Sequence, residues 1–356
     1  MKSQANPILE KSQKMTEKGF SFSQALASFM EGLSPRTRDI ISARFALGGG
    51  SVKTLEEIGS TYGITRERIR QILGSAFSAV RHQREHPLFK EAVATIETVL
   101  RSHSGIISYE ELFTLVAGES KKEQGAVTFF LECFRSIRMV KETPVRRRVF
   151  VLADFSLEAW DDVQAAVEKI FAGADHALTE AELFKRAQKM GVKIEKKVFF
   201  DYLAVSASVR KNSFGRFGLA HSSEISPRGT REKAYLILKM HGSPLHFKDI
   251  ATRIDKSGLQ KKGKITHPQT VHNELIKDKK FVLIGRGLYA LAEWGYARGT
   301  VREVLKTILE QHRAPMARED IVAAVANMRQ VKRSTVIINL NTFFEKVGKD
   351  EYTVKR

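Results

Sequence analysis

The chain has 356 residues, of which 42% are hydrophobic, so it is long enough for two or more globular domains. Lysine and arginine total 59 against 40 aspartates and glutamates, and the net charge of +19 favours a polyanionic partner. The single cysteine, Cys133, excludes an internal disulfide and a cysteine-based zinc site, which fits a reducing cytoplasm. The sequence shows no secretory leader and no apolar run of about 18 residues, so we expect a cytoplasmic protein without membrane contact.

Residues 1–30 begin with a polar stretch and continue with a weak helical pattern, which predicts a lead-in helix. Ser34 and Pro35 then suit the start of a helix, because serine caps free amides and proline fits the first turn. The glycines at 48–50 predict a break before the next helix. They lack the Lys-Ser/Thr that follows in a phosphate loop, so we interpret them as a connector.

The segment 54–81 predicts two helices joined by a tight turn. Thr54 and Glu57 have the spacing of a capping box, Gly63 supplies a flexible turn residue, and Thr65 caps the second helix. The face opposite the apolar stripe of that helix carries Arg66, Glu67, Arg70 and Gln71. Arginine and glutamine can form paired hydrogen bonds with base edges, so this face suits the major groove. The structural alternative is an ordinary helical hairpin with a solvated charged face.

Part of the chain resembles region 4 of the bacterial sigma-70 family, through residues 33–47, 54–59 and 65–72. The last two segments match the family signature almost letter for letter. The resemblance implies a helix-turn-helix that binds double-stranded DNA, and RNA polymerase core as a partner. It also implies that the DNA backbone is contacted by Arg38, Arg44, Thr54, Leu55, Thr65 and Arg68. The family often has a basic residue one turn beyond Gln71, where this chain has Ser75. The resemblance therefore does not extend to the consensus promoter element.

A promoter-opening member of this family also carries an upstream region 2, which captures melted DNA and binds the polymerase. The roughly 30 residues before the motif are too few for that region, so we expect no independent promoter melting. The resemblance covers about 50 of the 356 residues and leaves most of the chain to be explained.

Beyond Pro87 the chain repeats a pattern about every 70 residues. Each repeat predicts a helix, a short apolar stretch, a second helix, a third helix and a β-hairpin, which is the plan of a winged helix. The second-helix segments align at 107–112, 178–183, 245–250 and 316–321. The third-helix core pairs align at Val127/Leu131, Val198/Leu203, Val271/Leu275 and Val336/Leu340. We therefore expect a mainly α protein, with a helix-turn-helix module followed by four tandem winged-helix modules.

The expected boundaries are 1–30 for the lead-in, 31–86 for the helix-turn-helix, and 88–155, 156–222, 228–296 and 298–356 for the repeats. The third repeat resembles the HARE-type helix-turn-helix domain through residues 270–278, 281–291 and 293–296. That winged helix occurs in restriction-system proteins, chromatin-linked proteins and the delta subunit of bacterial RNA polymerase. The resemblance implies a role linked to DNA or to polymerase.

Basic residues precede or open each predicted third helix. Helix N-termini favour anions, so each cluster predicts a phosphate site, although a solvated helix start would show the same residues. The clusters are Lys121 and Lys122; Lys193, Lys196 and Lys197; Lys261, Lys262 and Lys264; and Arg329, Lys332 and Arg333. The predicted hairpin tip Arg146, Arg147 and Arg148 suits a wing that touches phosphate, and an exposed turn tolerates these arginines equally well.

No catalytic or metal-binding arrangement can be assembled from the residues. Residues 258–264 have the glycine and lysine spacing of a phosphate loop, but Ile265 stands where a magnesium-binding Ser or Thr is required. His267 and His272 have no partner acid in a metal motif. We expect neither enzyme activity nor a cofactor or metal.

The sequence thus predicts a sequence-specific DNA-binding protein of bacterial transcription, sigma-factor-like in initiation with RNA polymerase. Two alternatives remain. The winged helices could bind polymerase subunits, which would make the chain a scaffold or regulator, or the chain could be the DNA-targeting subunit of a restriction or modification system. The sequence does not set the oligomeric state.

Overall fold

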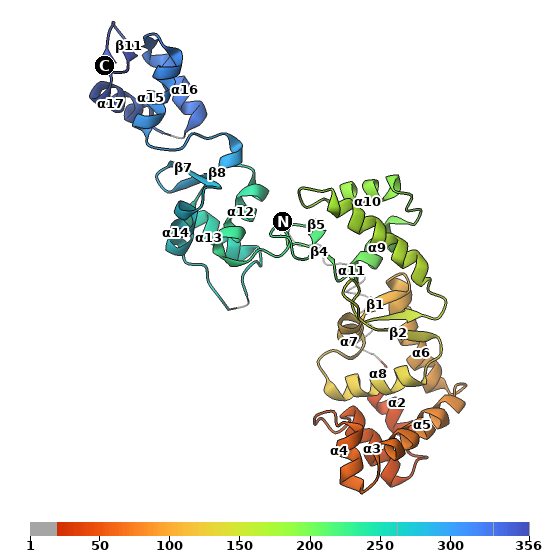
Figure 1. Ribbon diagram of the computed structural model, residues 1–356. Helices are drawn as coiled ribbons and strands as arrows, with labels where there is room; N and C mark the ends of the chain where they lie inside the picture. Colours follow the sequence, from red (N-terminus) through yellow and green to blue (C-terminus); the bar gives the residue numbers. More distant parts are fainter. Residues whose placement is uncertain (1–19, 262, 330, 356) are drawn as a thin grey trace. The chain divides into compact units, whose positions relative to one another are not determined.

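The computed structural model describes residues 20–355 except 262 and 330 (Figure 1). The chain divides into two compact units, residues 1–173 with 181–210, and residues 174–180 with 211–356. The described residues form sixteen α-helices and eleven short strands, which confirms the prediction of a mainly α protein. No helix among them combines the length and the apolar character needed to cross a membrane.

The first unit begins with four helices, which we call the head. They are α2 (Phe22–Met30), α3 (Pro35–Phe45), α4 (Leu55–Tyr62) and α5 (Arg66–His82). Each begins after a Ser or Thr whose side-chain oxygen accepts a hydrogen bond from the amide three residues further on. The predicted lead-in helix is therefore present at 22–30, whereas residues 1–19 lie outside the described residues.

Three repeats share one complete plan of helix, strand, two helices and hairpin. The first has α6 (Pro87–Ser102), β1 (Ile106–Ser108), α7 (Tyr109–Ala117), α8 (Lys121–Cys133), β2 (Ile137–Val140) and β3 (Val149–Leu152). The third has α12 (Gly229–His241), β6 (Leu245–His246), α13 (Phe247–Lys256), α14 (Pro268–Lys277), β7 (Phe281–Gly285) and β8 (Leu288–Leu291), followed by the 3₁₀ helix η1 (Ala292–Trp294). The fourth has α15 (Val301–His312), β9 (Met316–Ala317), α16 (Arg318–Met328), α17 (Arg333–Phe343), β10 (Glu345–Lys346) and β11 (Glu351–Thr353).

In these three repeats the short strand pairs antiparallel with the last strand of the hairpin. The strand orders are β1-β3-β2, β6-β8-β7 and β10-β11-β9. In the first repeat, Ile106 lies opposite Val151 and Ile107 opposite Phe150. The apolar stretch predicted before each second helix is therefore the strand that attaches that helix to the wing, as the winged-helix plan requires.

The second repeat is less regular. Its elements are α9 (Leu157–Ala172), α10 (Glu180–Lys189), α11 (Lys196–Ala204), β4 (Val209–Lys211) and β5 (Phe217–Leu219). The short strand is reduced to a single bridge between Leu178 and Phe217. The expected core pair Val198/Leu203 is wrong in its first member, because Phe199 is fully buried and Val198 is half-exposed. Phe199 and Leu203 are four residues apart and share a helix face, whereas a spacing of five turns the face away.

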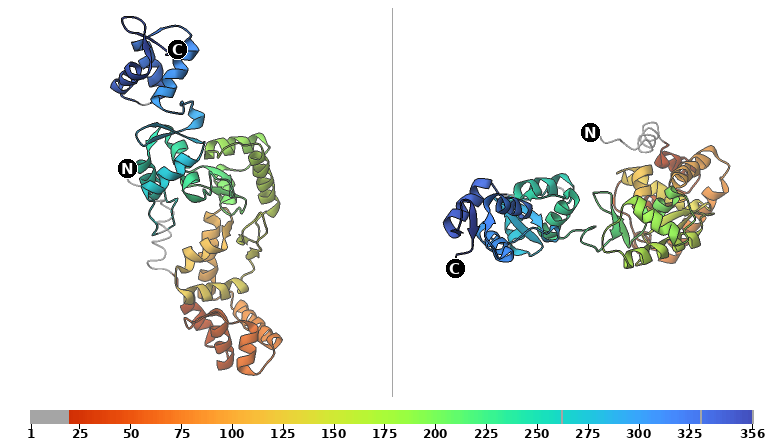
Figure 2. Two further views of the ribbon diagram at one scale, coloured as in Figure 1. Left: turned by 60° about the vertical axis from the view of Figure 1, so that its left-hand side comes forward. Right: turned by 90° about the horizontal axis from the view of Figure 1, so that it is seen from above.

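A single hydrophobic core joins the head to the first repeat. At its centre is α8, in which Ala126, Val127, Phe129 and Phe130 are fully buried. This helix packs against α2, α3 and α5 of the head as well as α7 of its own repeat (Figures 1 and 2). The expected boundary near residue 87 therefore separates two sequence motifs that share one core.

Two residues of α8 fit it to the head. Gly125 lies so close to the end of α3 that an added Cβ would collide with the carbonyl oxygen of Phe45. The Glu123 carboxylate accepts hydrogen bonds from the Ser21 hydroxyl at 2.8 Å and from the Ser23 amide at 3.2 Å. A carboxylate at the start of α2 is also favoured by the helix dipole. Shape and charge thus both fix α8 on the head.

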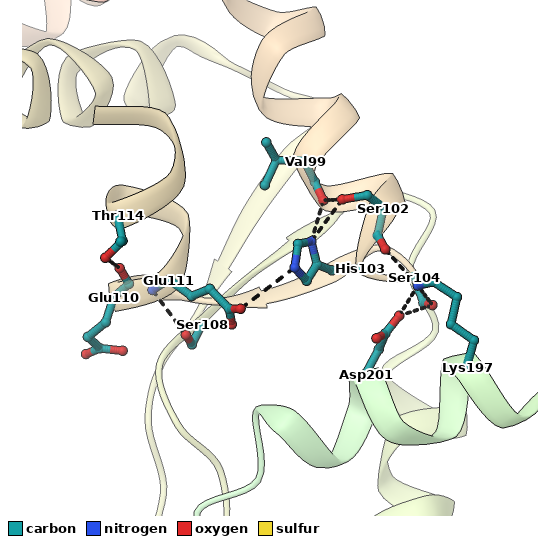
Figure 3. Close-up of polar contacts among 10 residues, drawn as sticks. All are labelled: Val99, Ser102, His103, Ser104, Ser108, Glu110, Glu111, Thr114, Lys197 and Asp201. Atoms are coloured by element: carbon teal, nitrogen blue, oxygen red, sulfur yellow. Dashed lines mark hydrogen bonds and ion pairs between the residues drawn. The ribbon is translucent and has the colours of Figure 1, made fainter. Parts of the chain in front are cut away.

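Polar contacts of α11 join the second repeat to the first (Figure 3). The Lys197 ammonium donates to the carbonyl oxygen of Ser102 at 2.7 Å and pairs with the Asp201 carboxylate. The Ser104 hydroxyl also donates to that carboxylate. The third helix of the second repeat, like α8, therefore contacts a neighbouring module.

In the second unit, the third and fourth repeats each have a core of their own. The core of the third includes Ile250, Ile254, Val271, Leu275 and Tyr289, and that of the fourth includes Leu305, Ile321, Val336, Leu340 and Tyr352. The two repeats are connected by Arg329, which is only 7% exposed. Its guanidinium donates to the carbonyl oxygens of Leu283, at 3.0 Å, and Gly299. Burial lowers the pKa of Arg329 from its ordinary value.

Candidate nucleic-acid interface

The turn between α4 and α5 is built from local capping interactions. Thr54 and Glu57 form a complete capping box, with the Glu57 carboxylate accepting from the Thr54 amide at 2.6 Å. That backbone hydrogen bond, aided by the Thr54 hydroxyl, lowers the pKa of Glu57. Gly63 ends α4 in the left-handed conformation, with φ at 62°. A Cβ at Gly59 would lie 2.6 Å from the carbonyl oxygen of Ile64, so the two helices approach closely at this point.

The outer face of α5 is charged and exposed. The predicted base-reading residues Arg66, Glu67, Arg70 and Gln71 all lie on it. Arg70 and Glu67 form a two-pronged ion pair, with Nε to Oε2 at 2.8 Å and Nη2 to Oε1 at 2.7 Å. The hydrogen bond from Arg70 lowers the pKa of Glu67, which keeps that carboxylate ionised. An exposed pair of this kind is readily exchanged for contacts with bases, because water screens it.

Arg68 and Gln71 form a second contact on α5, from Nη1 to Oε1 at 3.1 Å. The side-chain oxygens of Thr54 and Thr65 are used as helix caps. Leu55 is half-buried at the first position of α4, where backbone amides face outward. The residues expected to contact the DNA backbone here thus lie at the starts of α4 and α5. Free amides and the helix dipole favour phosphate at a helix start.

The two arginines expected on α3 have different surroundings. The Arg44 guanidinium donates to the carbonyl oxygen of Lys53 at 2.9 Å and therefore lies beside the start of α4. Arg38 is half-exposed. Sequence reasoning overlooked Arg36, whose guanidinium donates to the Tyr62 carbonyl oxygen at 3.3 Å and lies over the Tyr62 ring. At 3.6 residues per turn, helix positions 36 and 44 are separated by about 80°, against about 120° for 38 and 44, so the helical period could have identified Arg36.

The expected wing residues of the first repeat separate into different environments. Arg146 forms an ion pair with Asp161, and its guanidinium lies 4.9 Å from the Trp160 ring, so only 22% of this side chain is exposed. Contacts with the second repeat therefore engage the Arg146 guanidinium, so we no longer predict that Arg146 binds phosphate. Arg147 is half-exposed, and Arg148 is exposed with its guanidinium carbon 3.6 Å from the centre of the Tyr109 ring.

The basic clusters at the third helices also differ from one another. Lys121, Lys122, Lys193, Lys196, Lys261, Lys264 and Lys332 are exposed. Lys197 is engaged with the first repeat, Arg329 is buried between repeats, and Arg333 pairs with Glu319. Lys262 lies outside the described residues. Position at a helix start therefore does not by itself leave a cation available for phosphate, since tertiary contacts occupy several of them.

Residues 29–82 match the family model for sigma-70 region 4, and residues 229–294 match the HARE-HTH model, whose description names ASXL and restriction endonuclease proteins. Over 68 residues the chain is 44% identical to RNA polymerase sigma factor SigA from Nostoc sp. strain PCC 7120, from Microcystis aeruginosa and from Synechocystis sp. strain PCC 6803. These matches cover 19% of this chain and 17%, 16% and 16% of the three relatives. The chain thus spans about one sixth of the length of the curated relatives it matches.

Both resemblances predicted from the sequence are confirmed at the level of these segments. The matched domains are helix-turn-helix modules and do not belong to enzymatic families. The chain carries a sigma-70 region 4 domain and a HARE-type domain, which support a DNA-binding, transcription-related protein.

Proposed function

We propose that this protein binds duplex DNA sequence-specifically in bacterial transcription, with α5 as the reading helix and RNA polymerase core as a partner. The observation that supports it best is the exposed face of α5 in a fully capped helix-turn-helix that matches sigma-70 region 4. The name of the matched relatives, RNA polymerase sigma factor, supports the choice of polymerase. A sigma-like role in initiation belongs to this proposal.

Arg70 provides the test of the reading helix. Its guanidinium can exchange Glu67 for the O6 and N7 acceptors of a guanine, as paired donors do in the major groove. We expect Arg70→Ala to weaken binding to the preferred sequence by about 1 to 3 kcal/mol, or roughly 5- to 150-fold, and to relax the preference at one position. Binding-site selection from a random duplex pool, followed by titration of the selected and a scrambled duplex, measures both effects.

Arg84 is the matched control for Arg70. It is an exposed arginine beyond the end of α5, where its Nε lies 3.8 Å from the Glu85 carboxylate. Arg84→Ala removes the same charge and should leave the sequence preference unchanged. The proposal is wrong if the parent protein selects no sequence, or if Arg70→Ala and Arg84→Ala retain the same preference.

One observation favours a second function for the third and fourth repeats, namely docking of a protein. Their third helices carry exposed apolar side chains: Ile276 on α14 is 61% exposed, and Ile338 and Phe343 on α17 are 62% and 39% exposed. Such side chains suit a protein surface better than phosphates. If polymerase docks here, Ile276→Glu and Ile338→Glu should reduce co-purification with core polymerase. Met139→Glu, on the exposed wing of the first repeat, should not.

A further inference from the structure

The fold brings together three cations that are far apart in the sequence. Arg44 lies near the end of α3, Lys121 is the first residue of α8, and Arg148 directly precedes β3. All three line one groove of about 750 Å³ between the head and the first repeat. Tyr109 and the loop 50–52 also line it. We call it the junction groove.

Local contacts hold two of these cations in place. Arg44 is fixed by one hydrogen bond, from Nη1 to the Lys53 carbonyl oxygen, and a guanidinium has further N–H donors. The Arg148 guanidinium lies over the Tyr109 ring, and the Tyr109 backbone amide donates to the Arg148 carbonyl oxygen at 3.0 Å. A guanidinium placed over an aromatic ring keeps N–H donors available for other hydrogen bonds. The geometry is therefore suited to an anion with several acceptor oxygens.

The two walls of the groove belong to one rigid core. Gly125, which also lines the groove, contacts the end of α3, and the rings of Phe45 and Phe129 meet edge to face with centroids 5.4 Å apart. The head thus cannot rotate on the first repeat without opening this packing. The spacing of Lys121 and Arg148 relative to the reading helix is consequently fixed.

The charges around the groove favour a polyanion. The residues that line the groove include three cations and one acid, Glu110. The loop 50–52 leads directly to Thr54, the cap of α4, where Lys53 and the first amides of that helix add positive potential. A phosphate chain that passes the start of α4 therefore meets Lys53 and the three cations of the groove, alongside the acids Glu56 and Glu57 in the first turn of that helix.

We propose that the junction groove binds the phosphate backbone of the duplex whose bases α5 reads, so that the first repeat extends the DNA-binding surface of the head. This inference rests on the proposed function. Lys121 and Arg148 are proposed to contact phosphates because they line the groove. Their positions at a helix start and in a hairpin are not the basis of the proposal. Lys122 and Arg147, their sequence neighbours, do not line the groove.

The test compares two double variants on two lengths of DNA. Lys121→Gln/Arg148→Gln removes two groove charges, and Arg101→Gln/Lys141→Gln removes two exposed charges elsewhere in the first repeat. The short duplex contains only the sequence selected by the parent protein. The long duplexes add about one helical turn, roughly 10 base pairs, on one flank or the other.

The parent should bind one long duplex with a steeper salt dependence than the short one. On that duplex the plot of log K against log salt should be less steep for the groove variant than for the parent. The magnitude of its negative slope should fall by about 1.8, since each lost phosphate contact removes about 0.9. On the short duplex the groove variant should bind like the parent. The control variant should keep the parent's slope on every duplex. Arg148→Lys, tested alone against Arg148→Gln, should restore the slope because the charge is retained.

Equal slopes for the parent and the groove variant on all duplexes would overturn the proposal that the junction groove binds phosphate. That result would leave the proposed role of α5 unaffected. An equal loss in the control variant would also overturn it, because the effect would then follow net charge. Failure of the parent to prefer any short duplex would instead contradict the proposed function. Thermal unfolding of each variant checks that the loss of the Tyr109 contact has not unfolded the repeat.

Discussion

The two units use the same winged-helix plan in different ways. In the first unit, α8 buries Ala126, Phe129 and Phe130 between its own repeat and the head, and α11 contacts the preceding repeat through Lys197. In the second unit, the buried positions of α14 are Val271 and Leu275, and Asn273, Ile276 and Lys277 are exposed. The third helices of the first unit thus contact a neighbouring module, α8 by apolar packing and α11 by polar contacts, whereas α14 leaves Ile276 exposed.

The composition of the helices explains this difference. Within a winged helix, one apolar stripe at a spacing of three or four residues is enough to complete the core of the repeat. In α8, Phe129 and Phe130 are adjacent and point to different sides, so a second packing partner is required to bury both. In α14, the polar Asn273 and Lys277 are exposed together with the apolar Ile276. Both apolar faces of α8 are consequently buried.

The largest effect is expected at the contact between α8 and α3. Gly125→Ala places a Cβ against the carbonyl oxygen of Phe45, a backbone atom that cannot move away independently. We expect a loss of about 1 to 3 kcal/mol in the free energy of unfolding, the usual range for overpacking. Chemical denaturation followed by circular dichroism measures it.

The matched change for this prediction is Gly74→Ala. Gly74 is an exposed helical glycine on α5 with open space around it, so alanine should raise stability by about 0.5 to 1 kcal/mol. Alkylation of Cys133, at the end of α8, is a second measure of this packing. Burial raises the pKa of its thiol to about 12, and the protonated thiol alkylates slowly at pH 8. Gly125→Ala should speed alkylation. If both glycine variants behave alike, α8 is not fixed on the head by this contact.

A smaller effect is expected between the third and fourth repeats. Arg329→Ala removes the buried guanidinium that donates to the carbonyl oxygens of Leu283 and Gly299, two exposed residues that water can reach in its place. The expected cost is about 1 to 2 kcal/mol, confined to the second unit. Hydrogen exchange of the amides in β7 and at the start of α15 should quicken. Arg333→Ala breaks an exposed pair with Glu319 and should cost under about 1 kcal/mol; an equal cost would mean that Arg329 does not connect the repeats.

The smallest effect is expected at the contact between the first two repeats. Lys197→Ala removes one donor from a pair in which the lysine side chain is 53% exposed, so the loss should stay under about 1 kcal/mol. Thermal unfolding checks it. Lys196→Ala, at the exposed neighbouring position over the Phe200 ring, should change stability less. The reverse order would contradict a connecting role for α11.

Features that depend on neighbouring residues were predictable. The Thr54 and Thr65 caps, the Gly63 turn and the exposed face of α5 follow from hydrogen bonds within a few positions of the chain, and the winged-helix plan follows from a repeated pattern. Arg146 and Arg329 could not be placed in the same way. Their partners lie 15 and 46 residues distant in sequence, at Asp161 and Leu283, and a basic side chain looks the same whether it meets phosphate, an acid or a buried carbonyl.

Local sequence was enough to specify which helices form, where they begin and which face of α5 is charged and exposed, because capping and amphipathic period are local properties. Packing between distant segments sets which cations remain exposed and brings Arg44, Lys121 and Arg148 into one groove. It also makes α8 complete the head as well as its own repeat. An apolar face creates the need for a partner without specifying which one, because that choice depends on shape at sites such as Gly125 and Phe45.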